Sequence, residues 1–128
     1  MRARLASAAC VAALLAACAE APPAPAGLMD VAARPAESAL LAGIRAYEDA
    51  QYPTAEGELR RALATGLTSP RDRAAAHKYL AFIACTNERP ADCETEFREA
   101  RKADPAFALS RSEAGHPVWG PVYRRITP

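Results

Sequence analysis

The chain has 128 residues, with 16 basic and 15 acidic side chains and a hydrophobic fraction of 51%. A chain of this length forms at most one small domain. A net charge this close to zero lacks the basic excess on which nucleic-acid binding depends, so we expect no nucleic-acid partner.

The first 17 residues have the pattern of a lipoprotein signal peptide. Arg2 and Arg4 form a short basic region, and the apolar run 5–17 that follows is too short to span a bilayer comfortably. The run ends in Leu15-Ala16-Ala17-Cys18, which resembles the bacterial lipobox. We expect Cys18 to carry a lipid that holds the chain to a membrane. An ordinary secretory signal with an incidental cysteine is the alternative.

Residues 18–36 are predicted to form a linker between this anchor and a folded domain. Prolines interleaved with alanines favour an extended, semi-rigid chain; they are Pro22, Pro23, Pro25 and Pro35. Ala19, not an aspartate, follows Cys18. By the enteric sorting rule for lipoproteins, we expect the outer membrane as the destination, with the domain facing the periplasm.

Four helices, a short C-terminal capping helix and no strands are predicted in residues 37–128, so the expected fold class is all-α. Apolar residues recur there at helical spacing in four segments. The segments begin near Glu37, Ala55, Ser69 and Pro90, and end near Glu48, Gly66, Thr86 and Asp104. Ser69 is a natural N-cap, and Pro70 suits the first helical position.

The two helix pairs repeat with an offset of 38 residues. The matched pairs are Gly43–Ala81, Ala55–Cys93, Leu59–Phe97, Ala62–Ala100 and Leu67–Pro105. Small residues let two helices approach closely, and a large apolar residue one turn later fills the space beside them. This pattern resembles the tetratricopeptide repeat and predicts two helical hairpins. An unrelated four-helix bundle is the alternative.

The tail, 106–128, is predicted to cap these hairpins. About three such repeats are normally needed to bury their apolar faces, so two require a cap. The tail is rich in apolar groups, and Pro117 is placed to begin a short final helix. We expect this helix to lay Trp119 and Tyr123 over the fourth predicted helix.

The tail also carries the most distinctive motif, the segment His116-Pro117-Val118-Trp119-Gly120-Pro121. Together with 104–109, it resembles the end of the TssQ-family lipoproteins, which are associated with type VI secretion systems. The segment Lys78-Tyr79-Leu80-Ala81-Phe82 and the Cys85/Cys93 pair are similar to the same family. The resemblance covers about 37–126 plus the lipobox. It implies a tetratricopeptide-like domain on the periplasmic side of a secretion machine, with no catalytic chemistry.

After export, Cys85 and Cys93 would lie in an oxidising compartment. They stand four residues either side of Arg89 and so face each other across a hairpin turn. A disulfide would join the third and fourth predicted helices. Alternatively, Cys93 is only a small core residue at the helix crossing and Cys85 fills a groove.

The sequence shows no arrangement typical of an enzyme. His77 and His116 are the two histidines, far apart in the chain, whereas a metal site needs clustered ligands. We expect His77 to pack or lie on the surface and His116 to hold a turn. No serine or cysteine has a recognisable base beside it, and no glycine-rich phosphate loop is present. We therefore expect no catalysis, metal, cofactor or small-molecule substrate.

A partner-binding face is predicted on the first helix of each hairpin, which lines the inner surface in this repeat class. Its residues are Leu40, Ile44, Tyr47, Lys78 and Phe82. An apolar patch with a cation and a tyrosine suits a peptide or a helix of a partner. The alternative is that this face packs against the tail or forms part of the core.

Together these features predict an outer-membrane lipoprotein that binds a protein partner and is accessory to type VI secretion. One alternative is a pilotin-like or other envelope-assembly lipoprotein, which can share anchor and fold. Another is a regulator of a cell-wall enzyme.

Overall fold

The computed structural model describes residues 27, 30 and 34–128. The predicted signal peptide, Cys18 and nearly all of the predicted linker lie outside these residues. In the described part of the chain the regular structure is entirely helical, which confirms the all-α class.

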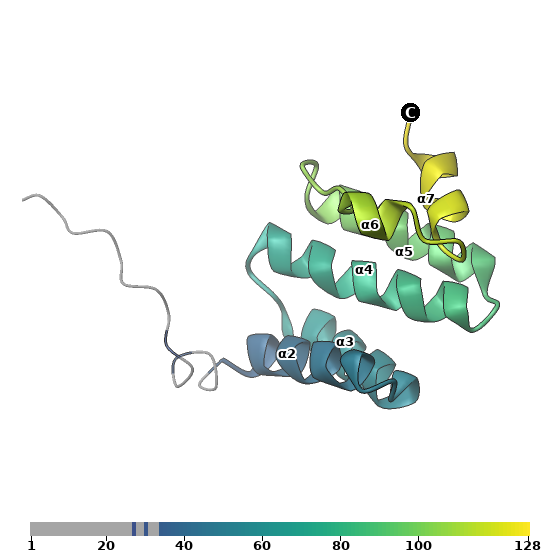
Figure 1. Ribbon diagram of the computed structural model, residues 1–128. Coiled ribbons are helices and arrows are strands. Elements are labelled where there is room, and N and C mark those ends of the chain that lie inside the picture. The colour runs from purple at the N-terminus through teal and green to yellow at the C-terminus, as the bar shows by residue number, and fades with distance from the viewer. Residues whose placement is uncertain (1–26, 28–29, 31–33) are drawn as a thin grey trace, which may run out of the picture.

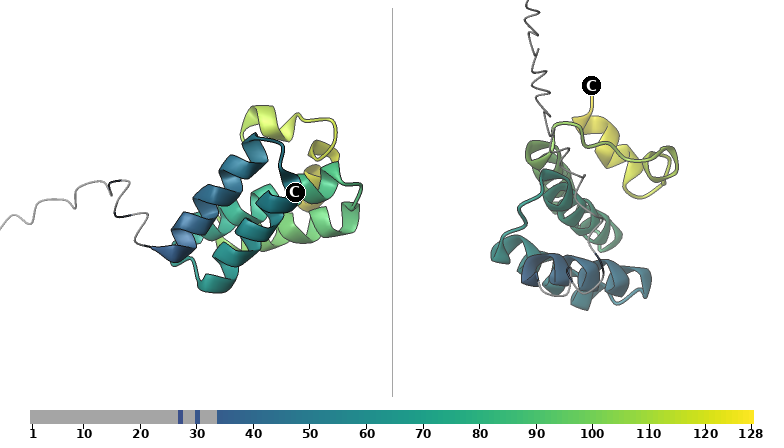
Figure 2. Two further views of the ribbon diagram at one scale, coloured as in Figure 1. Left: turned by 90° about the horizontal axis from the view of Figure 1, so that it is seen from below. Right: turned by 90° about the vertical axis from the view of Figure 1, so that its left-hand side faces the viewer.

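The described residues form two stacked helical hairpins followed by a helical tail. The helices are α2 (Pro35–Glu48), α3 (Tyr52–Thr65), α4 (Pro70–Thr86), α5 (Pro90–Ala103), α6 (Arg111–Ala114) and α7 (Gly120–Ile126). In Figure 1, α2 and α3 form one layer, α4 and α5 the next, and α6 and α7 lie on the far side of the second hairpin. Figure 2 shows the same order of layers from the side. The predicted pair of tetratricopeptide-like hairpins with a C-terminal helix is confirmed.

The 38-residue offset extends to the backbone of the two hairpin turns. Each turn contains one residue with a positive φ, Ala50 at 58° and Glu88 at 57°. This conformation is uncommon for residues other than glycine. The hydrogen bond from Ala50 N to Tyr47 O (3.0 Å) recurs from Glu88 N to Cys85 O (3.2 Å). The hairpins are therefore copies of one unit in their turns as well as in their sequence.

Local sequence signals set several helix ends. The Ser69 hydroxyl accepts a hydrogen bond from the backbone N–H of Asp72 at 3.2 Å, so Ser69 caps α4 as predicted. Gly66 ends α3 with φ 105°, in the left-handed region that favours glycine. The helix α2 begins at Pro35 and not at Glu37, since proline is readily accepted at the first helical position.

The first hairpin depends on a close approach between α2 and α3. A Cβ placed on Gly43 would lie 2.7 Å from Leu59 Cγ, inside van der Waals contact. In the second hairpin Ala81 and Phe97 occupy the equivalent positions, and both are fully buried. In both hairpins a small residue therefore faces a large one where the helices cross, as the repeat pattern predicted.

The helix α4 contributes to both hydrophobic clusters of the domain. Ala76, Leu80 and Ile83 pack in the first cluster, against α2 and α3. Ala81, Phe82 and Cys85 belong to the second, with α5 and the tail; its tail members are Leu109, Trp119, Val122 and Tyr123. Because α4 is covered from two sides, it is the central helix of the fold.

The tail departs from the prediction in three respects. The helix α7 begins at Gly120 and not at Pro117, and the short helix α6 precedes it unpredicted. Trp119 stacks on Phe82 of α4, whereas it was expected over the fourth predicted helix, now α5. Tyr123 does pack on α5, with its ring 5.3 Å from that of Phe97. The rings diverge because Trp119 stands before α7 begins, while Tyr123 lies within it.

Glycine-to-alanine substitutions at Gly43 and Gly57 test the close crossing. Alanine normally stabilises a helix interior by about 0.5–1 kcal/mol relative to glycine. Gly57 of α3 has no atoms within 4 Å of an added Cβ, so Gly57→Ala should raise the free energy of unfolding by that amount. Gly43→Ala should lower it by about 1–3 kcal/mol, because the new methyl overlaps Leu59. Chemical denaturation measures both; stabilisation by both variants would contradict the crossing.

Candidate functional site

The inner face of α2 and α4 is more closed than the sequence predicted. Leu40 is 6% exposed and packs in the first core cluster. Phe82 is 3% exposed and lies against the ring of Trp119. Burial makes these two residues unavailable to a partner, which corrects their prediction as binding residues and favours the alternative that they form core. Ile44, Tyr47 and Lys78 are only partly buried, so part of each side chain remains accessible.

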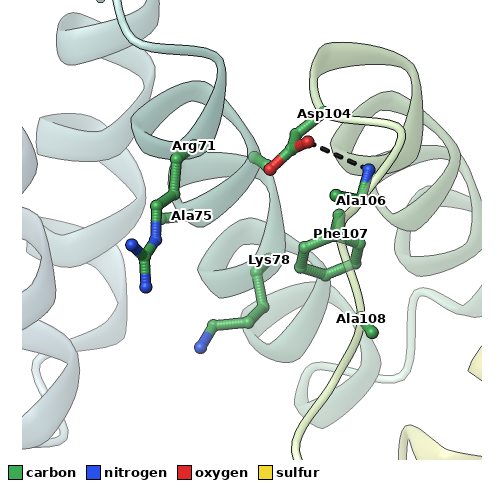
Figure 3. Close-up of a pocket in the computed structure, with 8 residues that line it drawn as sticks. Arg71, Ala75, Lys78, Asp104, Ala106, Phe107 and Ala108 are labelled. Atoms are coloured by element: carbon green, nitrogen blue, oxygen red, sulfur yellow. Dashed lines mark hydrogen bonds between the residues drawn. The ribbon is translucent and has the colours of Figure 1, made fainter.

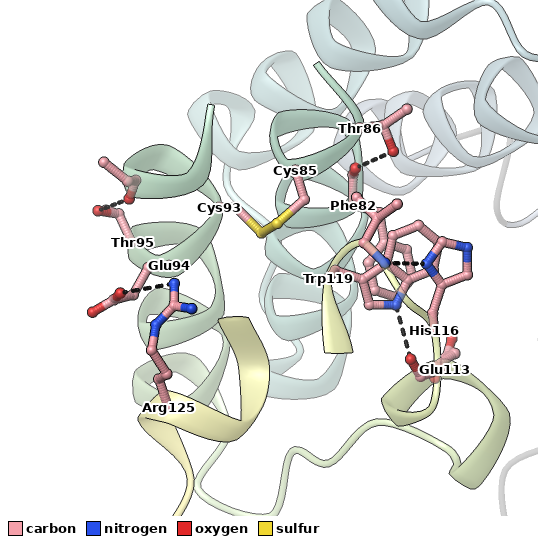
Figure 4. The surroundings of a disulfide bond; sticks show 12 residues. Phe82, Cys85, Thr86, Cys93, Glu94, Thr95, Glu113, His116, Trp119 and Arg125 are labelled. Carbon is pink, nitrogen blue, oxygen red and sulfur yellow. Dashed lines mark hydrogen bonds and ion pairs between the residues drawn. A yellow bond between two sulfur atoms is a disulfide. The ribbon is translucent and has the colours of Figure 1, made fainter. Parts of the chain in front are cut away.

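A stack of three rings closes the inner face at the end of α4. Trp119 lies on Phe82 with a centroid separation of 4.2 Å, and His116 lies on the other face of Trp119 at 3.4 Å. The indole Nε1 donates a hydrogen bond to the carbonyl of Glu113 at 2.9 Å (Figure 4). Stacked aromatic pairs contribute about 0.5–1.5 kcal/mol beyond their buried area. The tail is therefore attached to α4 by both packing and a directed hydrogen bond.

An ion pair joins the same helix to α6. Lys78 Nζ lies 2.8 Å from Glu113 Oε1, and it also lies 4.8 Å from the centre of the Tyr79 ring. The other Glu113 oxygen accepts from Ser110 N at 2.9 Å, and the Ser110 hydroxyl accepts from Glu113 N, which together form a capping box. One carboxylate thus begins the short helix α6 and attaches it to α4.

The environment of Glu113 keeps it ionised. Partial burial works against the charged form, but hydrogen bonds from Lys78 and from Ser110 N outweigh it, so the pKa of Glu113 is lowered. A carboxyl group whose pKa is lower in the folded than in the unfolded state stabilises the fold above its unfolded pKa. That contribution is lost as the pH falls through the folded pKa.

Tyrosine rings line the junction between the two hairpins. Tyr47 of α2 lies 5.1 Å from Tyr79 and 5.6 Å from Tyr52, measured between ring centres. Burial, followed by the charges of Tyr52, Tyr79 and Glu113, raises the pKa of Tyr47 to about 12. The Tyr47 hydroxyl therefore stays protonated at alkaline pH at which an exposed tyrosine would ionise.

A cavity of about 490 Å³ opens beside Lys78, between α4 and the segment that follows α5. Its lining residues are Arg71, Ala74, Ala75, Lys78, Asp104, Ala106, Phe107 and Ala108. In Figure 3, Arg71 and Lys78 extend from the same side of α4, and Phe107 faces Lys78 from the opposite wall. The cavity therefore combines two cations with an apolar wall.

Cys85 and Cys93 are joined by a disulfide in this structure, with Cα atoms 5.1 Å apart. The bond connects the end of α4 to the start of α5 across the hairpin turn (Figure 4). Both residues are also largely buried in the second core cluster. Closing so short a loop contributes about 2–3 kcal/mol in the chain-entropy view. The disulfide holds together the helices on which Trp119 and Tyr123 pack.

The histidines lie in different surroundings. His77 Nδ1 lies 2.7 Å from Glu96 Oε2 of α5, and Glu96 also pairs with Arg60 of α3 at 3.4 Å. His116 Nδ1 accepts from Val118 N at 3.2 Å, within the turn before α7. Among the described residues, no group of three or more His, Cys, Asp or Glu side chains is arranged to hold a metal ion.

None of the helices in the described range is long and apolar enough to cross a membrane. Cys18, the predicted site of lipid attachment, lies outside that range.

Sequence reasoning missed Glu113, Arg71 and Phe107 as parts of one surface. A signal existed for the first, since Ser110-Arg111-Ser112-Glu113 matches the capping-box spacing. Arg71 and Phe107 belong to helix α4 and to a non-helical segment well separated in sequence. They line the same cavity because the segment after α5 runs beside α4.

No family model, curated protein or solved structure matches this chain. Its similarity to the type VI secretion lipoproteins therefore stays a prediction based on the tail, the segment 78–82, the cysteine pair and the lipobox.

The Lys78–Glu113 pair can be tested through the single tryptophan of the chain. Trp119 reports on the tail because its indole donates to the Glu113 carbonyl. As the pH falls through the lowered pKa of folded Glu113, protonation of its carboxylate should weaken the pair and change Trp119 fluorescence. Glu113→Gln should abolish most of this acid transition. Glu58→Gln on α3, whose partner is Arg61, is the matched control and should retain it. An unchanged transition in Glu113→Gln would show that the ion pair does not hold the tail.

Proposed function

We propose that this chain is a lipid-anchored scaffold protein of the cell envelope. Cys18 would hold it to the outer membrane, and the helical domain would bind a protein partner in the periplasm. In this proposal the protein is accessory to assembly of a type VI secretion system.

The observation that carries the proposal is the surface where α4 meets the tail. Lys78 and Glu113 are held there by their ion pair, and the buried Trp119 supports them from beneath through ring stacking and its hydrogen bond to the Glu113 carbonyl. A surface held in place before binding loses little conformational entropy when a partner docks. This arrangement supports a binding role for a small helical domain.

The domain is also self-contained, as a tethered binding unit would need to be. Among the described residues, Val118 is the one large hydrophobic side chain left exposed, at 45%. A repeat stack that continued into another unit would expose an apolar end. The described residues thus bury nearly all of their large apolar side chains within the domain, and in this proposal the partner binds the sides of the hairpins.

Assignment to type VI secretion rests on the similarity of the tail, and the tail residues have defined structural roles. Trp119 stacks on α4, and an added Cβ at Gly120 would approach the carbonyl oxygen of Ala114 to 2.6 Å. A motif with such steric demands is more informative than the helical repeats, which are common among unrelated proteins.

Lipid labelling and crosslinking in the native host test the proposal. The wild-type chain should incorporate labelled palmitate and fractionate with the outer membrane, whereas Cys18→Ala should do neither. A photocrosslinker at exposed Ser112 on α6, beside Glu113, should capture a secretion-system component that mass spectrometry identifies, and one at exposed Thr95 on α5 should capture much less. Unlabelled wild-type protein would contradict the anchor. A secretin or a cell-wall synthase as the captured protein would contradict the assignment to type VI secretion.

A further inference from the structure

We propose that the cavity between α4 and residues 104–108 binds an extended acidic peptide segment of a partner protein. A carboxylate of the peptide pairs with Arg71, and a neighbouring apolar side chain packs on Ala75 against Phe107. This inference rests on the proposed binding function and specifies the chemistry of the partner.

One wall of the cavity is a single face of α4. Arg71, Ala75 and Lys78 recur there at helical spacing, with Ala74 beside them. The alanines are short, so the longer side chains of Arg71 and Lys78 stand on either side of a depression. Two cations flanking small apolar residues match a peptide that alternates acidic and apolar side chains.

The opposite wall is the non-helical segment that follows α5. The Asp104 carboxylate accepts a hydrogen bond from Ala106 N at 3.0 Å, which fixes the turn (Figure 3). The ring of Phe107 stands edge-on to Tyr123 at 6.4 Å and is partly buried. Phe107 is therefore held in position as an apolar wall.

The chain already places one carboxylate on this face of α4. Glu113 of the tail pairs with Lys78 at 2.8 Å. Arg71 lies two helical turns before Lys78 and is exposed. It is the one arginine of α3, α4 and α5 for which the described residues supply no acceptor. The others pair with carboxylates or backbone carbonyls; they are Arg60, Arg61, Arg73, Arg98 and Arg101.

The charges around the cavity favour one carboxylate over a densely charged anion. Arg71 and Lys78 supply two positive charges, but Glu113 already pairs with Lys78 and Asp104 adds a negative charge on the far wall. A polyphosphate would be repelled by both carboxylates. A single peptide carboxylate can form a two-point contact with the guanidinium of Arg71, which suits that geometry.

Binding of synthetic peptides to the full chain in detergent tests the proposal. The acidic probe is a fluorescein-labelled peptide of repeated Glu-Thr-Val, because β-branched residues favour an extended chain over a helix. One control probe has lysine in place of each glutamate, and a second has serine in place of each valine. Fluorescence anisotropy should show saturable binding of the acidic probe, weakened by salt, and much weaker binding of both controls.

Charge reversal locates the binding. Arg71→Glu should weaken binding of the acidic probe by about tenfold or more. Arg98→Glu makes the same charge change at an exposed position on α5, where Arg98 pairs with Glu94, and should leave the affinity within about twofold. Ala75→Leu partly fills the cavity without changing charge and should also weaken binding.

Three results would overturn the inference: no saturable binding of the acidic probe, equal binding of the lysine probe, or equal loss of affinity in Arg71→Glu and Arg98→Glu. If Arg71 is instead needed for binding to anionic phospholipid vesicles while no peptide binds, the cavity takes a lipid headgroup and the inference is wrong. The proposed scaffold function fails separately, when crosslinking in the native host captures no envelope protein.

Discussion

The stack of Trp119 on Phe82 covers the part of α4 that the first hairpin leaves open. This helix lies between two hydrophobic clusters, one shared with α2 and α3 and the other with α5 and the tail. In a longer repeat array the next hairpin would bury the second side of such a helix. Here the tail does so with a few large rings, which explains how two hairpins can form a complete domain.

Polar groups decide where the tail lies. The Glu113 carboxylate pairs with Lys78, its backbone carbonyl accepts from the indole of Trp119, and Ser110 caps the same short helix. Farther on, Arg101 Nη1 donates to the carbonyl of Ile126 at 2.6 Å. Apolar burial alone is not directional, so these contacts fix the direction in which the chain crosses α4. After α5 the chain runs beside α4 as residues 104–108, which form no further helix. The cavity beside Arg71 lies between this segment and α4.

Much of the fold could be predicted from the sequence because the relevant signals are local. Ser69, Pro70 and Gly66 mark helix ends through backbone geometry that each residue type favours. The 38-residue offset predicts the hairpins, since small and large residues must alternate where helices cross.

The candidate site was less predictable because it depends on contacts across the chain. Leu40 and Phe82 have the spacing of an exposed inner face, but their burial depends on neighbouring helices and on the tail. Trp119 was expected to pack on α5, and nothing in its local pattern distinguishes α5 from α4. Periodicity indicates which residues of a helix share a face, but it does not indicate what covers that face.

Native-state hydrogen exchange of a Trp119→Ala variant tests most directly whether the tail completes the burial of α4. If it does, amides near Phe82 and Cys85 in α4 should lose protection together with those of α7, because both belong to the cluster that Trp119 fills. Val118→Ala, which shortens an exposed neighbouring side chain, should leave both helices unchanged. Loss of protection in α7 alone, with α4 as protected as in the wild type, would contradict the account.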